Sequence, residues 1–283
     1  MNRADGAPTP RLAARAGPAA TVAGPNGAGD TAALLFVAEM YGAQLDQLAA
    51  ILGVTDRRAG DIAARWVARG QAQAGRLGPG PRWVWLTKTG LVSCGLRYVA
   101  NPPALSRLAH MRAVIAVRLA LESVPAYAGA SAHWRSERRL RARLGGRLGL
   151  RDHLPDAEVH WPEFPSSAIP DPPDGDVPGS RVAWAGECWA IEAELTPKTV
   201  SRTTAIMREL LTRTGDYGCP AAEVRVPGRP PRHARVIYLC APAAASTVAR
   251  ARDALGRDGA RIEIRSLPPG GYLPAAAGRR TRQ

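Results

Sequence analysis

The segment that most constrains this chain is residues 189–198, Trp-Ala-Ile-Glu-Ala-Glu-Leu-Thr-Pro-Lys. Apolar residues alternate in it with Glu192 and Glu194, and this period of two predicts a half-buried strand with both carboxylates on its open face. Side chains on one face lie roughly 7 Å apart, so one divalent cation could bind both. The Thr-Pro pair that follows predicts the N-cap and first residue of a helix. Lys198 is then expected in the first turn of that helix.

A third acid ends the sequence His-Leu-Pro-Asp at residues 153–156. From Asp156 to His160 the residues alternate again, which predicts a strand with Asp156, Glu158 and His160 on one face. A Pro-Asp pair, an acid-bearing strand and a nearby lysine outline a metal-dependent phosphodiesterase site. The predicted catalytic residues are Asp156, Glu192, Glu194 and Lys198, with the three acids as ligands of Mg²⁺ or Mn²⁺.

The same residues admit simpler roles, which the sequence leaves open. Asp156 could cap a turn, the glutamates could pair with arginines, and Lys198 could be solvated on a helix. His153 and Glu137 are further candidates to assist the site, although pairing with arginine is the main expectation for Glu137.

Residues 30–100 carry the pattern of a winged helix-turn-helix. Asp30 predicts the N-cap of a helix to about Gly42, a short helix covers 45–52, and Thr55-Asp56 starts a third helix to about Arg69. Strands at 71–77 and 82–86 flank a Gly-Pro-Gly-Pro turn and predict a hairpin. Arginines on the third helix and on the hairpin are expected to contact double-stranded DNA: Arg57, Arg58, Arg65, Arg76 and Arg82. The alternative is a three-helix module that binds protein.

Residues 104–267 predict a second domain of mixed helices and strands. A helix over 104–122 comes first, then strands, the acid strand, a helix over 199–214, a strand, a helix and a last strand. Asn-Pro-Pro at 101–103 is the expected boundary. Residues 1–29 and 268–283 are rich in Ala, Gly, Pro and Arg and predict loose tails. The expected fold class is therefore α+β or α/β, and helix 104–122 could be a homodimer interface as easily as a core helix.

Several motifs taken together resemble a known family. The order of elements in residues 104–267, with Pro155-Asp156 and the acid strand, resembles the PD-(D/E)xK nuclease core, a restriction-endonuclease-like mixed sheet. Leu-Thr-Lys-Thr-Gly-Leu at 86–91, which closes the hairpin, resembles winged-helix regulators. The winged helix, residues 134–141, His-Leu-Pro-Asp and the acid strand resemble the actinobacterial plasmid replication-relaxation family. The resemblance implies that Asp156 and Glu192 bind metal. Glu194 stands where the motif has its lysine, and Lys198 would supply that amine.

The charge favours a nucleic-acid partner. The net charge is +14, which points to a polyanion, although arginine codons of a GC-rich genome account for part of it. Lys88 and Lys198 are the only lysines, so a lysine beside the acid strand is distinctive. The cysteines, Cys94, Cys188, Cys219 and Cys240, are scattered and predict neither a zinc site nor disulfides, which favours a reducing cytoplasm. No apolar run predicts a membrane span or a signal peptide.

Three functions remain open from the sequence. The first is a DNA-binding accessory protein of a plasmid or integrative element, acting in replication, DNA relaxation or transfer with partner proteins of those processes. The second is an active Mg²⁺-dependent endonuclease or nickase. The third is a winged-helix transcription regulator.

Overall fold

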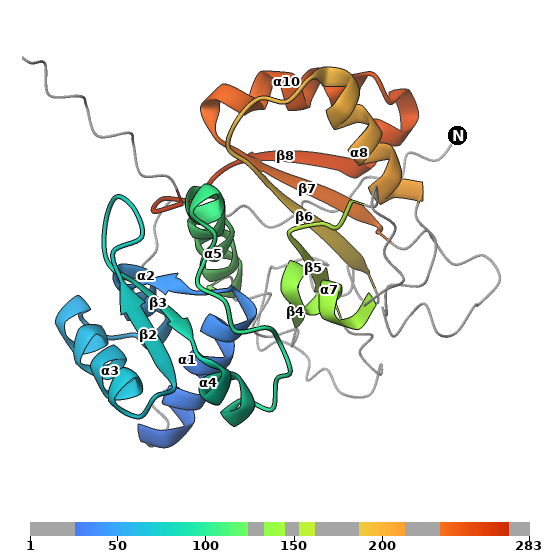
Figure 1. Ribbon diagram of the computed structural model, residues 1–283. Helices are drawn as coiled ribbons and strands as arrows, with labels where there is room; N and C mark the ends of the chain where they lie inside the picture. Colours follow the sequence, from blue (N-terminus) through green and yellow to red (C-terminus); the bar gives the residue numbers. More distant parts are fainter. Residues whose placement is uncertain (1–25, 124–132, 145–152, 162–186, 213–232, 272–283) are drawn as a thin grey trace, which may run out of the picture. The chain divides into compact units, whose positions relative to one another are not determined.

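The computed structural model describes residues 26–123, 133–144, 153–161, 187–212 and 233–271, which belong to two compact units (Figure 1). Of the described residues, the N-terminal unit contains 26–119 and 267–271, and the C-terminal unit contains those between 120 and 266. The described fold is mixed α+β, with a small antiparallel sheet in the N-terminal unit and a mixed five-stranded sheet in the C-terminal unit.

The N-terminal unit alternates short helices with a three-stranded sheet. Its elements are α1 (Asn26–Glu39), β1 (Ala43–Gln44), α2 (Leu45–Leu52), α3 (Asp56–Ala68), β2 (Ala72–Gly75), β3 (Trp83–Leu86) and α4 (Lys88–Ser93). β2 and β3 form the expected hairpin, and β1 pairs with the other edge of β3. Between α2 and α3, Gly53 has φ of 64°, which lets the chain turn sharply. Thr55 caps α3 as predicted, by accepting a hydrogen bond from the amide of Arg58.

The start of α4 lies very close to the start of the hairpin. Thr87 caps α4 by accepting from the amide of Gly90 at 3.2 Å, and its hydroxyl donates to the carbonyl of Gly70 at 2.6 Å. A Cβ added to Gly90 would lie 2.0 Å from the carbonyl oxygen of Gln71. Only glycine fits there, which gives the Thr-Lys-Thr-Gly sequence a packing reason.

The helix expected at 104–122 is present as η1 (Leu105–Arg107) and α5 (Leu108–Glu122), but most of it belongs to the N-terminal unit. Arg112 donates to both carboxylate oxygens of Asp46, at 3.0 and 2.6 Å, and Met111 packs against Trp83 and Trp85. The sequence had assigned this helix to the second domain. An amphipathic pattern shows that a helix has a buried face, but it does not show what covers that face.

The C-terminal unit is built on a sheet of order β4-β5-β6-β7-β8. Pairing is antiparallel from β4 to β6 and parallel from β6 to β8, so β6 is the middle strand. The elements are β4 (His133–Ser136), α7 (Glu137–Leu144), β5 (Ala157–His160), β6 (Cys188–Glu194), α8 (Val200–Thr212), β7 (Arg235–Cys240), α10 (Pro242–Asp253), η3 (Gly256–Arg261) and β8 (Ile262–Ser266).

Helices α8 and α10 cover one face of this sheet (Figure 1). The core between them contains Ala190 of β6, Tyr238 of β7, Leu210 of α8 and Val248 of α10. Because side chains two residues apart on a strand share a face, Glu192 and Glu194 lie on the same side as Ala190. The predicted acids therefore face α8.

Two helix starts differ from the expectation. α1 begins at Asn26, so Asp30 lies inside it rather than at its N-cap, and residues 26–29, which the sequence assigned to a loose tail, are helical. α8 begins at Val200, and Thr199 accepts from the amide of Arg202, so Lys198 lies in the loop before α8 and not in its first turn. A Thr-Pro pair is compatible with a loop as well as with a helix start. Residues 1–25, 162–186 and 272–283 lie outside the described residues.

Candidate functional site

Strand β6 is buried along its whole length, so the expected open face does not exist. Glu192 and Glu194 are only 4% and 5% exposed. β6 has a neighbouring strand on each edge, and its acid-bearing face is covered by α8. Alternation shows which side chains share a face, but it does not show whether that face meets water. Charges buried in this way require partners.

Asp156 lies beside both glutamates. Its Oδ2 accepts a hydrogen bond from the backbone amide of Ala193 at 2.8 Å, and Ala193 lies between Glu192 and Glu194 on β6. The charge of Asp156 acts on Glu192, and the charges of all three acids act on Tyr238. The three predicted metal ligands therefore lie near one another at one end of β6, but among the described residues they do not form a group whose ligand atoms all lie within 4.8 Å of one another.

His153 is the partner of Glu192. Its Nε2 lies 2.9 Å from Oε1 of Glu192, and its backbone amide donates to Glu209 of α8 at 2.8 Å. Burial lowers the pKa of His153, but its charge attraction and hydrogen bond to Glu192, with the charges of Asp156 and Glu209, together outweigh this and raise the pKa above its usual value. Burial raises the pKa of Glu192, His153 counteracts part of that rise, and Asp156 adds to it. His153 and Glu192 thus form a partly buried hydrogen-bonded pair of a base and an acid.

Lys198 is the partner of Glu194. Its ammonium forms an ion pair with Oε2 of Glu194 across the loop that joins β6 to α8. The Lys198 side chain is 34% exposed, whereas that of Glu194 is 7% exposed. The lysine thus reaches from the surface to the acid cluster, although it does so from the loop and not from the helix.

Tyr238 is a member of this site that the sequence did not single out. It is opposite Glu192 in the β6–β7 register and is 1% exposed. Burial and then the charges of Glu192, Glu194 and Asp156 raise the pKa of its phenol well above the usual value. Among the described residues its hydroxyl has no hydrogen-bond partner. A buried hydroxyl without a protein partner is uncommon, and a bound ion or water is a usual explanation.

We name this group the acid cluster: Asp156, Glu192 and Glu194 with Lys198, His153 and Tyr238. Its acids offer carboxylate oxygens, which Mg²⁺ and Mn²⁺ prefer. Glu137, the further acid that the sequence considered, forms an ion pair with Arg141 at 2.7 Å, which confirms the pairing expected for it.

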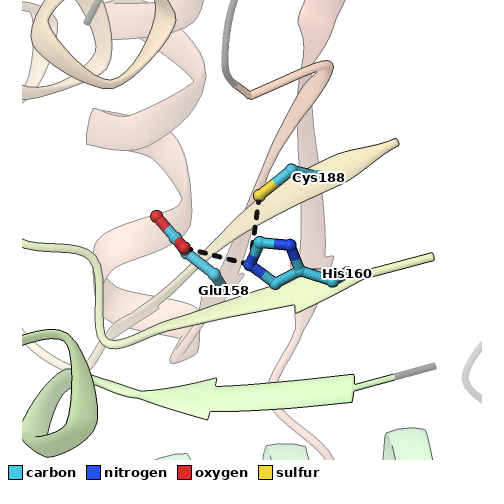
Figure 2. A group of neighbouring side chains, drawn as sticks. All are labelled: Glu158, His160 and Cys188. Atoms are coloured by element: carbon cyan, nitrogen blue, oxygen red, sulfur yellow. Dashed lines mark hydrogen bonds and ion pairs between the residues drawn. The ribbon is translucent and has the colours of Figure 1, made fainter. Parts of the chain in front are cut away.

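A second cluster lies toward the other end of β6, on the same face of the sheet. Glu158, His160 and Cys188 are all buried, and one ligand atom from each lies within 4.8 Å of the others. Nε2 of His160 is 3.1 Å from Oε2 of Glu158 and 3.6 Å from Sγ of Cys188 (Figure 2). The β5–β6 register places His160 opposite Cys188. The scattered cysteines predicted no zinc site because no two of them are closely spaced along the chain. Cys188 instead meets Glu158 and His160 across paired strands.

His233 extends this second cluster from just before β7. Its Nε2 lies 3.0 Å from Oε1 of Glu158, and its Nδ1 lies 2.8 Å from the carbonyl oxygen of Leu210. It is 1% exposed. Alternation along β5 indicated that Glu158 and His160 share a face, but no local pattern connected them with Cys188 or His233.

The predicted DNA-contacting arginines lie on the N-terminal unit. Arg57 and Arg58 are exposed on α3, and Arg76 and Arg82 are exposed in the hairpin segment. Arg65 is half-buried and its guanidinium lies 3.9 Å from the carboxylate of Asp30. The third helix and the hairpin thus carry basic side chains that solvent can reach.

No protein-family model, curated protein or solved structure matches this chain. Within the described residues, no helix is both long and apolar enough to cross a membrane.

Proposed function

We propose that this protein binds double-stranded DNA through its N-terminal unit. The observation that carries the proposal is the pair of exposed arginines, Arg57 and Arg58, in the first turn of α3, which follows α2 across the Gly53 turn. A hairpin with two further exposed arginines comes next. The element order α1-β1-α2-α3-β2-β3, with sheet order β1-β3-β2, supports a winged helix. In such modules the third helix enters the major groove and the hairpin contacts the backbone.

The host process rests on sequence resemblance alone. We infer from the replication-relaxation motifs that the protein is an accessory factor of a plasmid or integrative element. A winged-helix transcription regulator would share the DNA-binding unit. The acid cluster favours the accessory role, because a regulator has no need of buried carboxylates that fit a hard cation.

Fluorescence anisotropy with a labelled duplex tests DNA binding. We expect affinity to fall steeply with salt, by roughly 0.9 in log K per log salt unit for each phosphate contacted. The double variant Arg57→Ala/Arg58→Ala should weaken binding and reduce that slope by about 2 if both contact phosphates. Arg257→Ala, at an exposed position on η3 of the other unit, is the control. No binding by the wild type, or equal losses in both variants, would contradict the proposal.

A second candidate function, cleavage of phosphodiester bonds, is favoured by the acid cluster. Asp156, just before β5, and Glu192 on β6 offer carboxylates, and the Tyr238 hydroxyl, which has no partner among the described residues, supports a bound ion. The Lys198 ammonium contacts Glu194, the position at which the nuclease motif has its lysine. A divalent cation bound there would supply Lewis-acid activation of water and of the scissile phosphate. In this proposal Lys198 binds the phosphate and His153 holds Glu192 in place.

Incubation with supercoiled plasmid, in Mg²⁺ or Mn²⁺ against chelator, tests cleavage. The wild type should convert the plasmid to open circles only with metal, and Glu192→Gln and Asp156→Asn should not, while both still bind DNA. Glu263→Gln, a half-buried acid paired with Arg265 on β8, is the control and should behave as wild type. A mobility shift without conversion would leave a DNA-binding protein with an inactive cluster. Neither shift nor conversion would point to a protein partner.

A further inference from the structure

We propose that Glu158, His160, Cys188 and His233 form a structural zinc site, distinct from the acid cluster on the same sheet. The four residues are almost fully buried, with exposures of 0%, 6%, 3% and 1%. Glu158 and His160 are on β5, Cys188 begins β6, and His233 lies just before β7. The proposal does not depend on DNA binding or on cleavage.

The ligand atoms of Glu158, His160 and Cys188 are spaced to fit three corners of a tetrahedral zinc ion, and His233, which contacts Glu158, would supply the fourth after a shift of its ring. Zinc binds nitrogen and oxygen at about 2.0–2.1 Å and thiolate sulfur at about 2.3 Å, so neighbouring N and O ligands lie roughly 3.3 Å apart and N and S ligands roughly 3.6 Å apart. Nε2 of His160 lies 3.1 Å from Oε2 of Glu158 and 3.6 Å from Sγ of Cys188 (Figure 2). Nε2 of His233 lies 3.0 Å from the other carboxylate oxygen, Oε1 of Glu158.

Hydrogen bonds explain these contacts less well than a cation does. Nε2 of His160 faces a carboxylate oxygen and a sulfur, yet a ring nitrogen carries either one proton or one lone pair. If Nε2 is protonated and donates to Glu158, the sulfur contact gains little. If Nε2 is unprotonated, the Cys188 thiol can donate to it, but Nε2 and the Glu158 carboxylate are then two acceptors that face each other. A cation that accepts an electron pair from each of the three atoms satisfies all of them.

His233 has the second contact that is usual for a metal-binding histidine. The carbonyl oxygen of Leu210 can only accept, so Nδ1 of His233 carries the proton that it donates there. Donation of this kind from the other ring nitrogen to a backbone carbonyl fixes the ring of metal-binding histidines. Nε2 then has to share a proton with Oε1 of Glu158, and a cation can take the place of that proton.

The charges and ligand types select zinc. On binding, the thiol proton of Cys188 and the proton shared by Glu158 and His233 both leave, and Zn²⁺ replaces them without changing the net charge of the buried site. A thiolate, two imidazoles and a carboxylate are ligands for Zn²⁺, whereas Mg²⁺ prefers oxygen ligands alone. The acid cluster and the zinc site are therefore expected to select different metals.

The site would tie together segments that are distant in the chain. His160 and Cys188 are 28 residues apart, and Glu158 and His233 are 75 residues apart. Structural zinc contributes directly to folding because the site is absent from the unfolded chain. We expect zinc to stabilise the pairing of β5, β6 and β7.

Metal content and cobalt spectra of the full-length, untagged protein test the proposal. After treatment with chelator and reconstitution, the wild type should retain about one Zn²⁺ per chain through gel filtration, as measured by mass spectrometry of the metal. Mg²⁺ in large excess should not displace it. Co²⁺ in the same site should give intense visible bands of tetrahedral geometry and a thiolate charge-transfer band in the near ultraviolet.

Matched variants locate the site. Cys188→Ser should remove the charge-transfer band, and Cys240→Ser, at a buried cysteine on β7, should keep it. His233→Ala should lower zinc affinity at least about tenfold in a competition with a chelator. Glu192→Gln should bind zinc as wild type. Two results on the wild type overturn the proposal, whether or not a variant folds: failure to retain zinc, and a cobalt complex without the thiolate band. Loss of that band in Cys240→Ser also overturns it.

Discussion

The carboxylate of Asp156 accepts a hydrogen bond at 2.8 Å from the backbone amide of Ala193, which lies 37 residues later in the chain. The β5–β6 register ends with Ala157 opposite Ile191, so this side chain continues the ladder beyond the last pair of backbone partners. The contact also fixes a third acid beside Glu192 and Glu194. This hydrogen bond thus extends the pairing of β5 with β6 and also places a third acid beside Glu192 and Glu194.

Replacement of Asp156 should therefore weaken the C-terminal unit. Asp156→Ala leaves the amide of buried Ala193 without this acceptor and should destabilise the protein by about 1–3 kcal/mol. Asp156→Asn keeps an acceptor oxygen and should cost less. Urea denaturation followed by circular dichroism measures both. Asp258→Ala, at an exposed position on η3, is the control and should lie within about 0.5 kcal/mol of wild type. Equal stability of Asp156→Ala and wild type would contradict this prediction.

The His153–Glu192 pair should make stability depend on pH. The folded pKa of His153 is raised above its usual 6.5 by Glu192, despite burial, which acts in the opposite direction. A raised pKa gives stabilisation that is fully present below the unfolded pKa and is lost as pH rises through the folded pKa. The difference in unfolding free energy between wild type and His153→Gln should be largest below the unfolded pKa of histidine, about 6.5, and should shrink above its folded pKa.

Urea denaturation at several pH values measures that difference. In a Glu192→Gln background the carboxylate that raises the pKa is gone, so the effect of His153→Gln should vary much less with pH. A constant difference between wild type and His153→Gln across the range would show that the two side chains do not form a charged pair.

Gly90 should tolerate no side chain. A Cβ there would meet the carbonyl oxygen of Gln71 at 2.0 Å, and both belong to backbone that cannot move aside easily. Gly90→Ala should destabilise the N-terminal unit by about 2 kcal/mol or more. Gly60→Ala is the matched control, since nothing lies within 4 Å of a Cβ at that position in α3. Alanine is the better helix former, so Gly60→Ala should stabilise by up to about 1 kcal/mol. Thermal denaturation of the two variants tests whether Gly90→Ala lowers stability and Gly60→Ala raises it.

Arg112 should hold α5 on the N-terminal unit in a way that lysine cannot. Its guanidinium binds both oxygens of Asp46 and the side chain of Gln44, and it is 6% exposed. Lysine offers a single ammonium in place of the planar fork, so Arg112→Lys should cost about 2–4 kcal/mol. Urea denaturation followed by circular dichroism measures the difference between the variants. Arg97→Lys, at an exposed position, should be neutral. A neutral Arg112→Lys would show that the network is not required.

The sequence by itself determined most elements and the faces of their side chains. The cap at Thr55, the hairpin after α3 and the alternation along β6 are set by residues a few positions apart, and the structure has each of them. The apolar positions of α8 were also readable, since Ile206, Leu210 and Leu211 are buried as the helical period predicts. Caps, turns and periodicity act over one or two turns of chain, so sequence alone carries them.

Only the tertiary structure decided what each face meets. It made β6 the middle strand and so buried Glu192 and Glu194, it brought Lys198 to Glu194 from a loop, and it packed α5 on the N-terminal unit. It also brought Cys188 and His233 to Glu158 and His160, a cluster that no spacing rule contains. Strand order and register depend on contacts between residues that are 28 to 75 positions apart in these examples, and the stability of such contacts depends on everything else packed around them.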